Sequence, residues 1–186
     1  MSEDATELTT RNLAKQTFLR RQKTIEQFKK ESLTDELTGL YNRRGFNQKL
    51  DEYYSVAQRT GGVLRIVFID ADKFREINEN FGYGIGDLAL KAISKGVEKI
   101  FQRKTDAKAR WGGDEFVVLS LDEPGSYFME INKLSDRLNS TIGQSRSGKI
   151  PGEVPINVTL GIEVWNREDS IEGLVKKVED HMKLRK

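Results

Sequence analysis

The chain has 186 residues, which is enough for one domain of ordinary size and a short additional segment. The 31 Lys and Arg residues nearly balance the 29 Asp and Glu residues, so the net charge of +2 gives no basic field for binding nucleic acid. No apolar stretch reaches the length of a membrane span, and the acidic N-terminus resembles neither a signal peptide nor a transit peptide. We therefore expect a cytoplasmic protein without nucleic-acid or membrane partners.

The chain contains no cysteine, and His181 is its only histidine. The missing thiols exclude disulfides, a thiol nucleophile and a thiolate zinc site. A histidine-based catalytic triad or metal site is nearly excluded as well. Any metal would then be a hard cation held by oxygen ligands.

Residues 1–33 contain no Gly or Pro and predict one helix. Some of its apolar residues can share a heptad seam: Ala14, Phe18, Ile25 and Phe28. Arg11 and Arg21 fall on the same seam. Two interpretations stay open, a coiled-coil stalk that dimerises and a helix packed against its own domain.

From Thr34 onward, helix and strand patterns alternate. In chain order they predict a helix over 43–60, a buried strand over 63–69, a short helix over 74–80, a longer helix carrying Leu90 to Phe101, strands over 107–111 and 116–121, a helix carrying Tyr127 to Leu138, a polar loop over 140–155, a strand over 158–164 and a final helix from Ile171. This order predicts an α/β fold of the α+β type. Its sheet would be mixed and mainly antiparallel, with an internal β-hairpin, and helices would cover one face or both.

Two carboxylates stand at strand ends that one sheet can bring together. Asp70 ends the strand over 63–69, and Asp114 lies at the hairpin tip beside Gly112 and Gly113. Apposed carboxylates repel each other unless a divalent cation lies between them, and such a donor set suits Mg²⁺. Glycines expose the hairpin backbone to phosphate, and a second glycine cluster over 82–87 opens the long helix. A nucleotide pocket is the functional interpretation, whereas ordinary turn-forming Asp residues are the structural one.

Residues 112–116 read Gly-Gly-Asp-Glu-Phe, and the chain resembles the GGDEF-domain diguanylate cyclases. Residues 35–46 look like the first motif of that family, and residues 70–78 look like its metal- and base-binding stretch. The resemblance implies a nucleotide-cyclase-like fold with a ferredoxin-like core. Residues 34–186 would form the GGDEF catalytic domain, and residues 1–33 would form an N-terminal signalling helix.

Carried over by motif position, the resemblance implies that Asp70, Asp114 and the Ala71 carbonyl hold Mg²⁺, with Mn²⁺ as an alternative. Asp114 would also accept the proton of the attacking hydroxyl, with Glu115 beside it near the ribose. Asn78 and Asp87 match the pair that reads guanine. The other positions matched to substrate contacts are Phe74, Arg75, Tyr83, Gly112, Gly113 and Lys186.

The chain departs from the family pattern at several of these positions. Tyr83 stands where His is common, Arg75 replaces a phosphate-binding Lys, and Glu79 replaces Asp. Lys186 falls at the phosphate-binding Lys of the last helix, which matches only loosely. Arg103 and Asp106 lie at the spacing of the family's product-inhibition site.

The resemblance implies a cytoplasmic enzyme that condenses two GTP molecules into cyclic di-GMP and pyrophosphate. Each protomer of a homodimer would bind one GTP, and cyclic di-GMP would inhibit through Arg103 and Asp106. Signals would arrive through the N-terminal helix, from an upstream sensor segment or through dimerisation itself. The alternative is a weak or inactive GGDEF domain that acts as a cyclic di-GMP or GTP receptor and regulates a partner.

Overall fold

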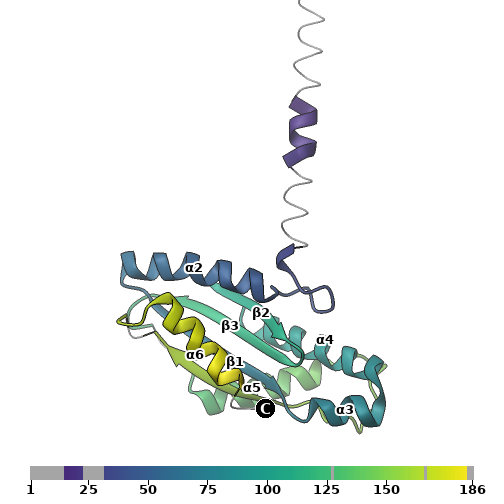
Figure 1. Ribbon diagram of the computed structural model, residues 1–186. Coiled ribbons are helices and arrows are strands. Elements are labelled where there is room, and N and C mark those ends of the chain that lie inside the picture. Colours follow the sequence, from purple (N-terminus) through teal and green to yellow (C-terminus); the bar gives the residue numbers. More distant parts are fainter. Residues whose placement is uncertain (1–14, 23–31, 127, 166, 184–186) are drawn as a thin grey trace, which may run out of the picture.

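The computed structural model describes residues 15–22, 32–126, 128–165 and 167–183 (Figure 1). The helices and strands follow one another in the predicted order. They are α2 (Arg43–Thr60), β1 (Val63–Ala71), α3 (Phe74–Phe81), α4 (Tyr83–Ile100), β2 (Asp106–Gly112), β3 (Glu115–Asp122), α5 (Ile131–Gln144), β4 (Val158–Val164) and α6 (Ile171–Lys183). This α+β arrangement confirms the predicted fold class.

The strands form a single four-stranded sheet in the order β2-β3-β1-β4. All pairings between these strands are antiparallel, which confirms the prediction of a mainly antiparallel sheet with an internal hairpin, while the parallel strand pair of a mixed sheet is not found among these four strands. Among the residues that the structure describes, the parallel pairing is confined to an isolated bridge between Tyr41 and Ala109. There the Tyr41 amide donates to the Lys108 carbonyl at 3.0 Å, and the Arg110 amide donates to the Tyr41 carbonyl at 2.8 Å. The segment before α2 therefore covers the edge of β2.

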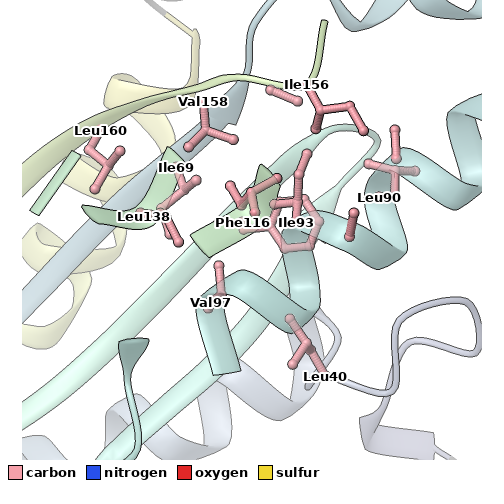
Figure 2. Close-up of a cluster of buried hydrophobic side chains, with 14 of the residues drawn as sticks. Leu40, Ile69, Leu90, Ile93, Val97, Phe116, Leu138, Ile156, Val158 and Leu160 are labelled. Carbon is pink, nitrogen blue, oxygen red and sulfur yellow. The ribbon is translucent and has the colours of Figure 1, made fainter. Parts of the chain in front are cut away.

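Helices cover both faces of the sheet, α2 and α6 on one face and α4 and α5 on the other (Figure 1). Alternate side chains of β1 point to opposite faces, as the pleat requires. Val67 and Ile69 join the cluster that packs against α4 and α5, and Figure 2 shows Ile69 there among other buried side chains. Ile66 and Phe68 join the second cluster, which packs against α2 and α6. The central strands are therefore apolar on both sides.

Helix α5 differs from its prediction at both ends. It begins at Ile131, four positions after Tyr127, which lies outside the described residues, and it continues to Gln144. The predicted polar loop over 140–155 is therefore wrong at its start. Its apolar residues Ile150 and Val154 are 6% and 1% exposed and belong to the core beside α4 and α5. The many polar residues of this segment concealed a few buried anchors.

In the N-terminal segment, residues 15–22 are helical, and Phe18 and Leu19 are 61% and 50% exposed. Phe18 belongs to the predicted seam, and the other apolar seam positions, Ala14, Ile25 and Phe28, lie outside the described residues. The coiled-coil interpretation stays a prediction. No helix in the described parts of the chain has the length and apolar character needed to cross a membrane.

Candidate active site

The sheet brings the predicted acids together at the tip of the β2–β3 hairpin. In the antiparallel register of β1 and β3, Asp70 lies directly opposite Glu115. The amide of the next residue, Ala71, donates to the Asp114 carbonyl at 3.2 Å. Residues separated by more than forty positions in the sequence are therefore neighbours, as the strand pattern predicted. Three carboxylates share one corner of the sheet.

These carboxylates lie in buried or partly buried positions, where an uncompensated negative charge costs free energy. Glu115 is 5% exposed, and Asp70 and Asp114 are partly buried. Among the described residues, no three acidic or histidine side chains converge closely enough to hold a metal by themselves. The donors present fit a divalent cation that takes two carboxylates and the Ala71 carbonyl and completes its shell with water and phosphate oxygens.

The two glycines at the hairpin tip leave open space around the backbone of the turn. Gly113 has φ +49°, and the register of the two strands shifts between Arg110 and Gly112. A Cβ at Gly112 or Gly113 would meet nothing within 4 Å, so space remains on this turn. Arg110 donates from Nε and from its second terminal nitrogen to the Gly113 carbonyl, at 2.8 and 2.6 Å. That guanidinium fixes the turn without filling the open side.

The pair expected to read guanine lies where α3 meets α4. Asn78 is partly buried on α3, and Asp87 is exposed in the first turns of α4. Gly86 lets the helices approach, because a Cβ there would lie 2.0 Å from Asn78 Oδ1 and 3.2 Å from the Phe74 ring. Sequence reasoning noticed the glycine cluster but missed Gly86 as a positioning residue. The feature of the sequence that could have identified Gly86 is its place directly before Asp87.

Two positions on α3 that depart from the family pattern, Arg75 and Glu79, pair with each other. Arg75 Nε donates to Glu79 Oε1 at 2.7 Å, and the Arg75 side chain is 90% exposed. Glu79 therefore holds the guanidinium along the helix surface, although the pair is open to solvent and weak. Tyr83, at the start of α4, is 80% exposed. Lys186 lies outside the described residues, as does the side chain of His181.

The segment leading into α2 is tied to the hairpin by an ion pair across 75 positions of sequence. Arg110 donates to both oxygens of Asp35, at 3.3 and 3.2 Å, and Asp35 also accepts from the amide and hydroxyl of Thr38. Burial raises the pKa of Asp35, but these hydrogen bonds and the arginine charge outweigh burial, so its pKa lies below the ordinary value.

An open cavity of about 620 Å³ lies beside this ion pair. Its lining combines the segment before α2, the first turn of α2 and the hairpin: Ser32, Asp35, Asn42, Arg43, Arg44, Arg110, Trp111, Gly112 and Gly113. Asn42 begins α2 by accepting from the Gly45 amide at 3.0 Å, and the Arg43 guanidinium stacks 4.6 Å from the Trp111 ring centroid. The cavity therefore places arginine side chains close to the hairpin glycines.

The predicted inhibitory pair lies at the other, open end of the same hairpin. Asp106 begins β2, and its Oδ2 accepts from the Arg103 amide at 2.9 Å while its Oδ1 accepts from the Ser120 hydroxyl at 2.8 Å. The Arg103 guanidinium pairs instead with Asp122, which sequence reasoning did not single out. Arg103 and Asp106 line a cavity of about 290 Å³ together with residues of α4 and α5.

An antiparallel sheet with acids and glycines at one hairpin tip defines the class as a nucleotide-cyclase-like α+β domain. The family profile described as "Diguanylate cyclase, GGDEF domain" matches residues 32–186. The chain therefore belongs to the GGDEF-domain family of diguanylate cyclases, as its motifs predicted.

Curated relatives and a solved structure agree with this assignment. The chain is 31% identical over 155 residues to diguanylate cyclase DgcP of Pseudomonas aeruginosa and 35% identical over 133 residues to diguanylate cyclase DgcP of Escherichia coli. These matches cover 83% and 71% of this chain but only 22% and 38% of those proteins. The coiled coil and GGDEF domain of DgcB from Caulobacter crescentus, solved with c-di-GMP, superposes with a TM-score of 0.73 at 20% identity, covering 93% of this chain and 91% of that one. This last likeness concerns the fold.

Proposed function

We propose that this protein is a diguanylate cyclase, which joins two GTP molecules into cyclic di-GMP with release of two pyrophosphates. The observation that carries the proposal is the register of β1 and β3, because it gathers Asp70, Asp114 and Glu115 beside an open glycine turn. Such a corner suits a polyphosphate held through a divalent cation. Family membership and the curated cyclase relatives support the same reaction.

In the proposed mechanism, Asp70, Asp114 and the Ala71 carbonyl hold Mg²⁺ or Mn²⁺. The bound cation supplies positive charge to the α-phosphate and the leaving pyrophosphate. Asn78 and Asp87 orient guanine through its hydrogen-bonding edge, while Phe74 and Tyr83 line that region. Gly112 and Gly113 leave the hairpin backbone accessible to phosphate.

Each step transfers one nucleotidyl group. The 3′-hydroxyl of one GTP attacks the α-phosphate of the other, so that a new P–O bond forms and the bond to pyrophosphate breaks. Asp114 accepts the proton of the attacking hydroxyl, and Glu115 beside it faces the ribose. Arg75 and Lys186 neutralise the outer phosphates. No covalent enzyme intermediate is needed, and positioning with charge stabilisation carries the rate.

A homodimer follows from this chemistry, since each GGDEF domain of residues 34–186 binds one GTP and two must face each other. We assign the dimerising role to residues 1–33 as a coiled-coil stalk that raises the effective concentration of the second domain. The exposed Phe18, which lies on the predicted seam, supports this role. The DgcB structure, described as a coiled coil with a GGDEF domain, offers the same arrangement in a relative.

Product inhibition is proposed to act through Arg103 and Asp106, which line the cavity at the open end of the hairpin. The DgcB structure contains c-di-GMP, which supports a cyclic dinucleotide as the ligand class for a GGDEF fold. The proposed inhibitory pair lies at the open end of the hairpin and the proposed catalytic acids lie at its tip, so the length of β2 and β3 separates the two sites. A cytoplasmic location and an upstream sensor segment complete the proposal.

Incubation of the purified chain with GTP and Mg²⁺, followed by chromatography of the nucleotides, tests the proposed reaction. We expect cyclic di-GMP from the unmodified protein and none from Asp114→Asn. A parallel calorimetric titration with cyclic di-GMP should give the same affinity for both proteins. Absence of product with intact cyclic di-GMP binding would assign the chain to the receptor class instead.

A further inference from the structure

The carboxylate of Asp122 is buried at the open end of the β2–β3 hairpin. Its side chain is only 1% exposed at the end of β3, and each of its oxygens pairs with a different guanidinium. Oδ2 accepts from Arg65 of β1, and Oδ1 accepts from Arg103. A carboxylate removed from water in this way depends on its cationic partners.

The two arginines hold Asp122 under very different conditions. The Arg65 side chain is 13% exposed, and its guanidinium carbon lies 5.0 Å from the centroid of the Phe128 ring. The Arg103 side chain is 58% exposed and lines the cavity of about 290 Å³. Arg65 is therefore enclosed in the protein, whereas Arg103 can turn toward the cavity while its backbone stays in place.

Asp106 does not compete for the Arg103 side chain. Both of its oxygens are engaged by other donors, the Arg103 amide at 2.9 Å and the Ser120 hydroxyl at 2.8 Å. These bonds fix the backbone before β2. The carboxylate that holds the Arg103 guanidinium lies 19 positions further along the chain, at Asp122.

We propose that Asp122 competes with an anionic ligand for the Arg103 guanidinium, and that Arg65 sets how readily Asp122 releases this guanidinium. This inference rests on the proposed function, since the ligand is the product, cyclic di-GMP. When Arg103 turns to a ligand phosphate, Asp122 keeps Arg65 as its counter-ion and is not stranded as a buried charge. The pair therefore sets the product concentration at which inhibition begins.

Calorimetric titration of the whole chain with cyclic di-GMP tests the competition. Asp122→Asn removes the negative charge and keeps a hydrogen-bond acceptor, so we expect the dissociation constant to fall by about three- to tenfold. Glu123→Gln is the matched control, because it removes the same charge from the exposed neighbouring residue. We expect that variant to change affinity by less than about twofold.

A second variant predicts a change of opposite sign. In Arg65→Met, Arg103 is the remaining arginine on Asp122, so releasing it would strand a buried carboxylate. We expect the dissociation constant to rise by about fivefold or more. General destabilisation cannot produce tighter binding in one variant and weaker binding in the other, so the pair of signs carries the test.

The unmodified protein gives a test that needs no variant to fold. In NMR spectra of guanidinium-labelled protein, saturating cyclic di-GMP should shift the Arg103 Nε–H signal much more than the Arg65 signal. Equal affinity of Asp122→Asn and the unmodified protein, or a static Arg103 signal, would overturn the competition and leave the cyclase proposal standing. Complete absence of binding would overturn the inhibitory site together with this inference, while product formation from GTP is measured separately.

Discussion

The two ends of the β2–β3 hairpin treat their charges in opposite ways. At the tip, Asp114 and Glu115 lie beside Asp70, and the nearby Arg110 contacts Asp35 and the Gly113 carbonyl. At the open end, Asp122 is clamped between Arg65 and Arg103. One end collects carboxylates around open backbone, whereas the other neutralises its carboxylate with arginine.

This difference would let one small hairpin support the two proposed sites. An end rich in carboxylates recruits a divalent cation and, through it, phosphate. An end that presents an arginine on a neutralised surface binds an anion directly. The strands between them are paired to each other and mostly buried, so we expect a change at one end to leave the geometry of the other intact.

The largest expected effect tests whether the tip and the open end of the hairpin act independently. Asp70→Asn removes a proposed cation ligand at the tip, and we expect the rate of cyclic di-GMP formation to fall by about 10²–10³-fold. Calorimetry should show unchanged affinity for cyclic di-GMP at the open end. Loss of both properties together would break the comparison, because it would mean that the ends act as one unit.

The next prediction concerns the expected guanine-binding region, where Gly86 leaves room for the Asn78 amide. Gly86→Ala places a Cβ about 2 Å from Asn78 Oδ1, so the amide must move, and we expect the KM for GTP to rise by about tenfold or more. Gly84→Ala is the control on the same helix, because its Cβ would meet nothing within 4 Å. Equal steady-state kinetics of the two variants would argue against a role for Asn78 in binding GTP.

A smaller effect concerns the tie between the α2 segment and the hairpin. Asp35→Ala removes the ion pair with Arg110 and the hydrogen bonds from Thr38, and we expect it to lower the free energy of unfolding by about 2 kcal/mol. Glu36→Ala alters the exposed neighbour and should change stability by less than about 0.5 kcal/mol. Urea denaturation of both variants gives the comparison, and similar midpoints would contradict a structural role for Asp35.

The smallest effect is a pH dependence of the same tie. The pKa of Asp35 is lower in the folded protein than its ordinary value of 3.8, so the unfolded chain takes up the proton first as the pH falls. The contribution of Asp35 to stability is therefore fully present above about pH 4 to 5 and is lost as the pH falls through the folded pKa. Urea midpoints measured from pH 6 to pH 3 should fall more steeply for the unmodified protein than for Asp35→Asn.

Much of the fold could be predicted because the signals are local. Apolar periodicity gave the order of helices and strands, and the glycine pair between two short apolar runs gave the hairpin. The end of α5 and the buried Ile150 could not be predicted in this way, because their polar neighbours suggested a loop. The mainly antiparallel sheet was predicted, but the order of its strands was not, since strand order depends on packing between distant segments.

The residues of the candidate site were likewise predictable from the sequence only in part. The motifs at 70–78 and 112–116 carry their chemistry in residue types and spacing, and strand pairing alone brings Asp70 to Glu115. Gly86 is marked in the sequence only by its glycine cluster and its place before Asp87, and Asp122 carries no comparable signal. Their roles depend on what a Cβ would strike and on which arginine reaches a buried carboxylate.

The sequence by itself determined the class of domain, the order of its elements and the residues that bear the proposed chemistry. The tertiary structure alone decided which charges pair, because Arg110 reaches Asp35 across 75 positions and Arg65 reaches Asp122 across 57. Periodicity and motif spacing are properties of neighbouring residues. Ion pairing at the ends of a sheet depends on which strands lie side by side and on how deeply each side chain is buried.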